Sequence, residues 1–113
     1  MWVFLNNAFL SIVADRNTPE RLLVRARFEG DIERVFPDAA VTETPDADYR
    51  FRAFLPRETV ANAIAAALTA MTATNFKSSV KDRWRHDIYL DVWSTMSAAQ
   101  NRQRSLARRS RSR

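Results

Sequence analysis

The sequence has no cysteine, one glycine and one histidine among its 113 residues. Without cysteine, the chain has no disulfide framework, no thiolate nucleophile and no cysteine-based zinc site. No apolar run approaches the roughly 18 residues that a membrane-spanning helix needs, so we expect no membrane partner. Met1–Leu5 is apolar but short and is followed by Asn6-Asn7, so we expect no signal peptide. These absences fit a cytoplasmic location.

Acidic residues are missing from residues 102–113, a segment that holds six arginines. The other twelve basic residues stand against all 13 acidic ones, so residues 1–101 carry a formal charge of −1 and the net +5 belongs to the tail. Arginine-rich tails bind polyanions by counterion release without reading sequence. The candidate residues for this contact are Arg102, Arg104, Arg108, Arg109, Arg111 and Arg113. The alternative is a tail that only aids solubility. Because the tail lacks glycine and proline, the last helix can continue into it.

The order of patterns along the chain favours an α+β fold. Strand patterns come mostly first and long helical patterns last, which is typical of an antiparallel sheet with helices on one face. We predict about four strands (hairpin, strand, short helix, strand) with two C-terminal helices packed on one face. At this length we expect a single domain over residues 1–100, followed by a basic tail over residues 101–113.

The strands are predicted from β-prone runs and alternation. Trp2–Leu5 and Phe9–Ala14 form a hairpin around Asn6-Asn7-Ala8, where asparagine tolerates the left-handed conformations of a tight turn. Residues 22–28 give the third strand. A short strand at residues 40–43 precedes the next loop. Residues 49–55 alternate strictly, with Tyr49 on the apolar side.

The helices are predicted from caps and helical spacing. Asp31 caps a short helix that Pro37 stops, and Pro56 opens a helix to about residue 71. That helix carries an apolar stripe: Val60, Ile64, Leu68 and Met71. The last helix begins either after a cap at Asn75 or near residue 80, and the sequence leaves both starts open.

Two arginine pairs are the most informative internal feature. Each pair shares one side of its strand, opposite the apolar residues: Arg25 and Arg27, Arg50 and Arg52. If the two strands are neighbours, four guanidinium groups gather on one face, where they bind phosphate or carboxylate bidentately. The alternative is a solvated face paired with acids such as Glu29 and Glu43, each pair contributing about 0–1 kcal/mol. An RNA-binding sheet also needs exposed aromatic residues, and Phe54 alone clearly falls on the arginine side.

An apolar stripe on the last helix includes Trp84, Ile88, Trp93 and Met96. Such a stripe at helical spacing normally marks burial against the sheet, so we predict core positions for it. The alternative is that part of the stripe stays exposed, with Trp84 and Trp93 as a hot spot for a protein partner.

His86 precedes Asp87 on the same helix, with Tyr89 one turn further on. A metal-independent ribonuclease would use such a histidine as its general acid, while the plainer interpretation is a histidine on the helix surface. Because this is the single histidine, we expect no metal site. We nominate no catalytic residue and expect no cofactor.

Several motifs together resemble a known family. They are Met1-Trp2-Val3-Phe4, Val24-Arg25-Ala26-Arg27, Asn75-Phe76-Lys77 and Val92-Trp93-Ser94-Thr95-Met96. This pattern resembles a family of small uncharacterised bacterial and phage proteins with a Met-Trp start, a VRAR strand, an NFK segment and a C-terminal VWSxM helix. The resemblance covers about residues 1–100 and implies a compact α+β unit encoded in bacteria or mobile elements. It implies no activity and no catalytic residues, and the arginine tail lies outside it.

We therefore predict a non-enzymatic interaction protein that binds an acidic or nucleoprotein partner through its arginine face and tail. Small cysteine-free α+β proteins of mobile elements often inhibit host or defence machinery, including CRISPR complexes, and this class-level analogy suggests such an inhibitor. A nucleic-acid-binding module is the alternative, and a ribonuclease using His86 is the third hypothesis. The oligomeric state is left open.

Overall fold

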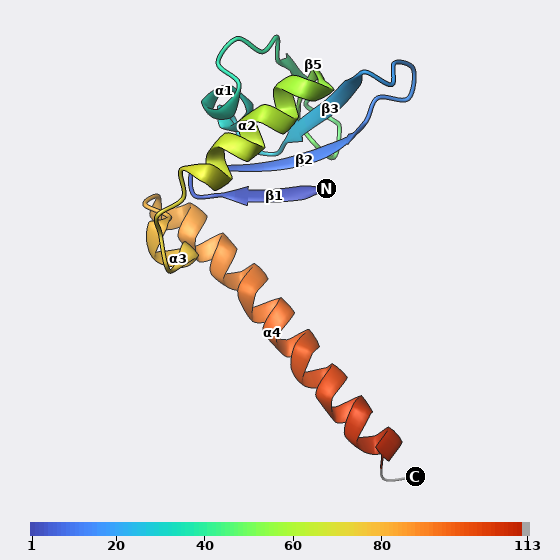
Figure 1. Ribbon diagram of the computed structural model, residues 1–113, viewed down its shortest axis with the longest axis vertical. Helices are drawn as coiled ribbons and strands as arrows, with labels where there is room; N and C mark the ends of the chain where they lie inside the picture. Colours follow the sequence, from blue (N-terminus) through green and yellow to red (C-terminus); the bar gives the residue numbers. More distant parts are fainter. Residues whose placement is uncertain (112–113) are drawn as a thin grey trace. The chain divides into compact units, whose positions relative to one another are not determined.

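The computed structural model describes residues 1–111 of the chain. The contacts within it fall into two compact units, Met1–Thr74 and Asn75–Arg113, and each unit is described by itself (Figure 1). Unit 1 contains the sheet and two helices, and unit 2 contains the other two helices. The predicted boundary at residue 100 falls inside the last helix, and a single domain over residues 1–100 stays a prediction.

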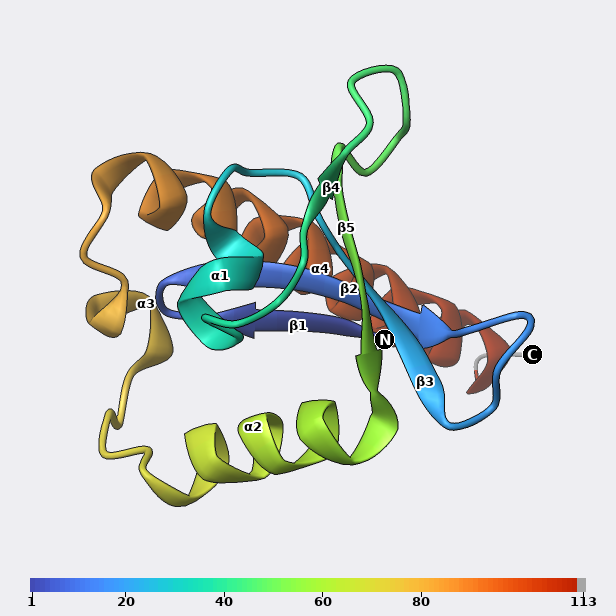
Figure 2. The ribbon, with the colours of Figure 1, turned by 90° about the horizontal axis from the view of Figure 1, so that it is seen from above.

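Unit 1 is built on an open five-stranded sheet in which every pairing is antiparallel (Figure 2). The strands are β1 (Trp2–Leu5), β2 (Ala8–Ala14), β3 (Arg21–Ala26), β4 (Thr42–Glu43) and β5 (Phe51–Pro56). Their order across the sheet is β1-β2-β3-β5-β4. The α+β class and the antiparallel sheet are therefore confirmed. The sheet has one strand more than the four predicted, and the short segment expected at residues 40–43 forms the two-residue strand β4.

The first hairpin forms where the β-prone runs predict it. Trp2 pairs with Ser11 and Leu5 with Ala8, which leaves Asn6 and Asn7 as the turn. The N–H of Ile12 donates to the Met1 carbonyl at 2.8 Å, and the Met1 amino group donates to the Ile12 carbonyl at 2.7 Å. Among residues 1–111, a positive φ occurs at Gly30 alone. The predicted left-handed asparagine is thus wrong, because this turn closes without one.

One face of the sheet carries the hydrophobic core of unit 1. Alternate residues of β2, β3 and β5 supply most of it, because side chains two apart share a face. The core residues are Leu10, Ile12, Val24, Ala26, Ile32, Phe36, Phe51, Ala53, Leu55 and Val60. Through Ile32 and Val60, α1 (Asp31–Val35) and α2 (Arg57–Thr69) pack on this same face. The opposite face of the sheet, which we call the open face, carries no helix of unit 1.

Helix α1 begins differently from the prediction. Asp31 is not its cap: the residue before the helix is Gly30, with a φ of 87° that glycine adopts without steric cost. The side chain of Asp31 is instead completely buried. Its carboxylate accepts a hydrogen bond from the Phe9 backbone N–H at 2.9 Å and from Arg34 Nη1 at 2.6 Å. Asp31 therefore ties the start of α1 to β2.

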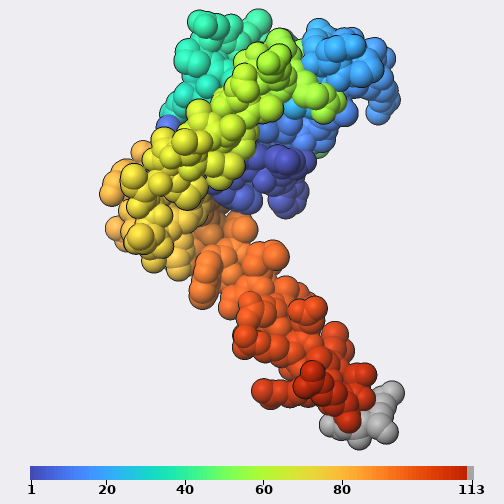
Figure 3. Space-filling view, in the orientation of Figure 1, coloured from blue at the N-terminus to red at the C-terminus, as the bar shows by residue number. Residues whose placement is uncertain are grey.

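Helix α2 covers the core with its first turns. Pro56 precedes it, as expected from a residue whose φ suits a helix start. Val60 is buried, but Leu68 and Met71 at the far end of the predicted stripe are 64% and 60% exposed. The space-filling view shows the yellow-green surface of this segment open to the outside (Figure 3).

Unit 2 consists of α3 (Phe76–Ser79) and α4 (Arg83–Arg111). The predicted cap at Asn75 is confirmed, since its Oδ1 accepts from the Ser78 N–H at 3.2 Å. The two starts that the sequence left open are both used: α3 ends after one turn and α4 begins anew. The Phe76 ring stacks on Tyr89 with centroids 5.8 Å apart, which joins α3 to α4. No helix within residues 1–111 is long and apolar enough to cross a membrane.

Candidate functional site

The predicted arginine face forms around one cross-strand pair. β3 and β5 are neighbours, and Arg25 lies directly opposite Arg52 in their register. Like charges in this position repel, and each guanidinium has a partner that reduces this cost. Arg25 Nη2 donates to Ser11 Oγ at 2.7 Å. Arg52 Nη2 donates to Asp48 Oδ1 at 3.1 Å, and Arg52 Nε to the Tyr49 carbonyl at 3.3 Å.

Tyr49 lies between two of the predicted arginines. The guanidinium carbons of Arg25 and Arg27 are 4.4 Å and 4.2 Å from the centre of its ring, within cation–π range. Arg27 Nη1 also donates to the Asp48 carbonyl at 2.8 Å. The prediction that Tyr49 belongs to the apolar side is therefore wrong. β5 begins only at Phe51, so strand alternation does not extend back to Tyr49.

Arg50 does not join this group. Its Nη2 and Nε contact Glu43 Oε1 at 2.6 Å and 2.8 Å, and both side chains are about half exposed. Glu43 pairs with Phe51 in the register of β4 and β5, which draws Arg50 to the β4 edge. The expected gathering of four guanidinium groups is thus corrected to three. We call Arg25, Arg27 and Arg52 the arginine cluster.

The arginine cluster keeps a positive charge. Its three guanidinium groups face one carboxylate partner, Asp48, which pairs with Arg52, so this group of four residues carries a formal +2. Arg25 Nε is buried and has no hydrogen-bond partner. The alternative of a solvated face paired with acids therefore describes Arg50 and Arg52, but not Arg25 and Arg27.

Aromatic residues share the open face with the arginine cluster. Trp2 pairs with Ser11, and Ser11 with Arg25, so Trp2 lies in the same cross-strand row as the cluster. Trp2 is 66% exposed and Phe54 is 51% exposed. The guanidinium of Arg21 lies 4.6 Å from the centre of the Phe54 ring. Sequence patterns placed Phe54 here but missed Trp2, because its face depends on the register of β1.

Tyr49 should release its phenol proton below its ordinary pKa near 10. Burial acts to raise the pKa of Tyr49, but hydrogen bonding with Ser11 and Trp2 and the charges of Arg27 and Arg25 together lower it. A folded-state pKa below the unfolded one adds stability as the pH rises through the folded pKa, in full above the unfolded value. Ultraviolet absorbance of the phenolate during a pH titration measures this pKa.

Tyr49→Phe should remove the phenolate transition of Tyr49 from the titration. Arg27→Gln should move the Tyr49 transition back toward its ordinary value. Identical titration curves for wild type and Tyr49→Phe would contradict the lowered pKa.

Helix α4 exposes much of its apolar stripe. Trp84, Trp93 and Met96 are 46%, 54% and 65% exposed. The prediction of core positions is wrong for these residues and for Ile88, which is also exposed. The alternative in the prediction, exposure of Trp84 and Trp93, is what the structure has. The Lys77 ammonium lies 4.3 Å from the centre of the Trp93 ring. The four exposed stripe residues cover about half of the helix circumference, because Trp84 and Trp93 are nine residues apart, and we call this exposed surface the apolar face of α4.

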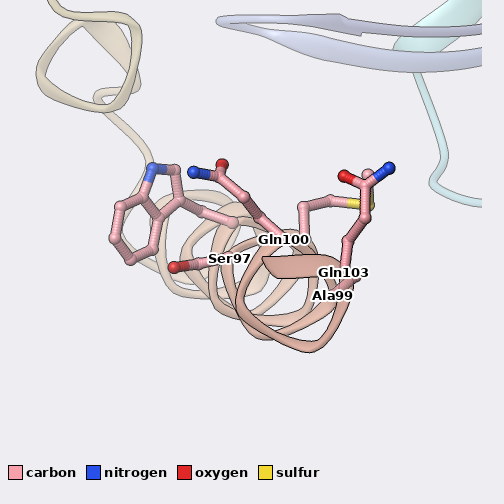
Figure 4. A pocket seen from close by; sticks show the side chains of 6 residues that line it. Ser97, Ala99, Gln100 and Gln103 are labelled. Carbon is pink, nitrogen blue, oxygen red and sulfur yellow. The ribbon is translucent and has the colours of Figure 1, made fainter. Parts of the chain in front are cut away.

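A shallow hollow borders the middle of α4. It is lined by Trp93, Met96, Ser97, Ala99, Gln100 and Gln103. Figure 4 shows the labelled side chains of Ser97, Gln100 and Gln103 projecting outward from α4. These residues recur at three- and four-residue intervals, so they continue the apolar face of α4 into a mixed surface that reaches Gln103, between Arg102 and Arg104.

The C-terminal part of α4 is the predicted basic tail in helical form. It holds five exposed arginines and no acid: Arg102, Arg104, Arg108, Arg109 and Arg111. Arg113 of the predicted set lies outside the described residues. Cations at a helix C-terminus interact favourably with the helix dipole. We call this segment the basic end of α4.

His86 lies near the start of α4. Its Nδ1 is 3.4 Å from Asp87 Oδ1, while the buried Tyr89 hydroxyl accepts from Arg85 Nη1 at 3.4 Å. The Tyr89 hydroxyl is thus engaged with Arg85. Among residues 1–111, no group of three or more acidic or histidine side chains is arranged to hold a metal ion.

Comparisons with protein-family models, curated proteins and solved structures give no match for this chain. The resemblance to small bacterial and phage proteins stays a prediction.

Proposed function

We propose that this protein is a non-enzymatic binding protein that attaches to a nucleoprotein through α4. The observation that carries this proposal is that one continuous helix, α4, has an exposed apolar part followed by a basic part. α4 runs for 29 residues, about 43 Å at 1.5 Å per residue. Its first part exposes the apolar face, and its last part is the basic end. Inhibition of host or defence machinery, as predicted from the sequence, belongs to this proposal as its biological outcome.

The two parts of α4 suit two kinds of contact. Exposed tryptophan is the side chain most enriched at protein-binding hot spots, so the apolar face fits a protein surface. Five arginines without an acid fit the phosphate backbone of a nucleic acid. A membrane-surface helix usually has its cations beside an apolar face along its length. Here the cations follow the apolar face in sequence, which favours a nucleoprotein.

The test uses the full chain and a fluorescent duplex oligonucleotide. Anisotropy should show binding that weakens steeply as salt rises, because arginine contacts release counterions. Trp93→Ala should leave this binding unchanged, since Trp93 precedes the basic end. In a pull-down from nuclease-treated lysate, the same substitution should reduce the captured protein. Salt-independent affinity, or captured protein that vanishes entirely with nuclease, would contradict the nucleoprotein assignment.

A further inference from the structure

The open face of unit 1 has the composition of a binding surface for nucleic acid. α1 and α2 both pack on the core face, so no helix of unit 1 covers the open face. Trp2 and Phe54 are aromatic residues on this face, and each is more than half exposed. These are the features on which unpaired bases stack in single-strand-binding proteins.

The positions of the two rings would suit a single nucleic-acid strand that runs across the sheet. Trp2 is on β1 and Phe54 on β5, which are three strand positions apart in the sheet order. At about 4.8 Å per strand, the rings are about 14 Å apart across the sheet. They would therefore stack separate bases rather than the two faces of one base.

The arginine cluster shares the open face with these rings, and Arg25 on β3 lies between the strands that carry them. Arg25 and Arg52 occupy the row of Trp2 across the sheet, and Arg27 lies beside Arg25 on the Tyr49 ring. With Asp48 the cluster keeps a formal +2, and Arg52 retains a partly exposed side chain. Guanidinium forks of this kind bind phosphate oxygens bidentately.

We propose that the open face binds single-stranded nucleic acid, with bases stacked on Trp2 and Phe54 and phosphates at Arg27 and Arg52. A duplex fits less well, because its bases are paired and present no free faces for stacking. The surface is separate from the basic end of α4: it belongs to the other unit and uses stacking as well as charge. It therefore goes beyond the function proposed for α4.

The test compares full-chain variants by anisotropy with a labelled single strand of roughly 12 nucleotides, within the range that one small domain covers. Polydeoxythymidine and polyuridine strands form two arms that distinguish DNA from RNA. Phe54→Ala and Trp2→Ala should each weaken binding at least about fivefold, which is the low end for loss of one stacked base. The slope of affinity against salt should stay unchanged, because no cation is removed.

Matched controls separate stacking from other effects. Leu68→Ala removes an exposed apolar side chain of α2, outside the open face, and should have no effect. Trp2→Phe should restore most of the binding lost in Trp2→Ala. Circular dichroism and thermal unfolding identify any variant that fails to fold. Because Phe54 lies on a different strand from Trp2, each variant tests the surface independently.

Equal affinity of wild type, Trp2→Ala and Phe54→Ala for the single strand would overturn the proposal, as would tighter binding of the matched duplex. Its failure is distinguishable from failure of the function of α4. Loss of arginines from the basic end changes the salt slope, whereas loss of Trp2 or Phe54 changes affinity at constant slope.

Discussion

Asp31→Ala should lower the free energy of unfolding by about 2–4 kcal/mol. The substitution leaves the buried N–H of Phe9 without its 2.9 Å acceptor, which alone costs about 1–3 kcal/mol. The rest comes from the charge-assisted bond to Arg34 at 2.6 Å. This second contribution is the smaller one, because the Arg34 side chain is 44% exposed and water replaces part of it. Urea unfolding followed by circular dichroism measures the loss.

Two further variants show whether the buried carboxylate is responsible. Asp31→Asn keeps an oxygen acceptor of similar shape and should lose less than Asp31→Ala. Asp38→Ala removes an exposed acid just beyond α1 and should change stability by no more than about 0.5 kcal/mol. Equal losses for Asp31→Ala and Asp38→Ala would contradict the role of Asp31 as an anchor.

The role of Asp31 shows which contacts local sequence patterns do not predict. An aspartate after glycine and before an apolar run is typical of a helix cap, and the helix itself was predicted correctly. Local sequence patterns do not predict that this carboxylate faces β2, because its hydrogen-bond donor, the Phe9 N–H, is 22 residues away in the sequence. Local patterns therefore located α1 but not the contact that fixes it.

The sheet was predictable because alternation is local. Phe51, Ala53 and Leu55 alternate in sequence and are all buried in the structure. The error at Tyr49 arose at a strand end, where alternation says nothing about the residue before the first ladder pair. This error changed the predicted site, because Tyr49 contacts Arg25 and Arg27, while Arg50 pairs with Glu43 and leaves the arginine cluster.

The candidate surfaces were predicted in part for the same reason. Spacing within each strand placed Arg25 and Arg52 on one side, and adjacency of β3 and β5 brought them together. Trp2 needed the register of a third strand, which no local pattern supplies. The apolar face of α4 was expected to be buried, since helical periodicity indicates which residues share a face but not what covers them.

The open face and the basic end of α4 illustrate two ways of holding positive charge. In the arginine cluster, cation–π contacts with Tyr49 and hydrogen bonds to Ser11 and Asp48 hold each side chain in place. Side chains fixed in this way lose less entropy on binding and favour a defined ligand geometry. The basic end presents its arginines around an exposed helix, which favours non-specific contact with phosphates.

Replacing the arginines of the basic end with glutamine should nearly abolish the salt dependence of duplex binding. The substitutions are Arg102→Gln, Arg104→Gln, Arg108→Gln, Arg109→Gln and Arg111→Gln. If three to five of them contact phosphates, the wild-type slope of log affinity against log salt is about −2.7 to −4.5. Wild type should then lose roughly 40- to 500-fold in affinity between about 50 and 200 mM salt, and the variant less than about threefold. Anisotropy titrations at several salt concentrations measure both slopes.

The matched control keeps the charge and changes the group that bears it. Replacing the same five arginines with lysine should preserve the salt slope, because a phosphate contact by either cation releases a counterion. Glutamine and lysine resemble arginine in helix propensity, so the helical circular dichroism signal should persist in both variants. If the glutamine variant kept the wild-type slope, the phosphate contacts would lie outside the basic end of α4, and the nucleic-acid half of its proposed function would be wrong.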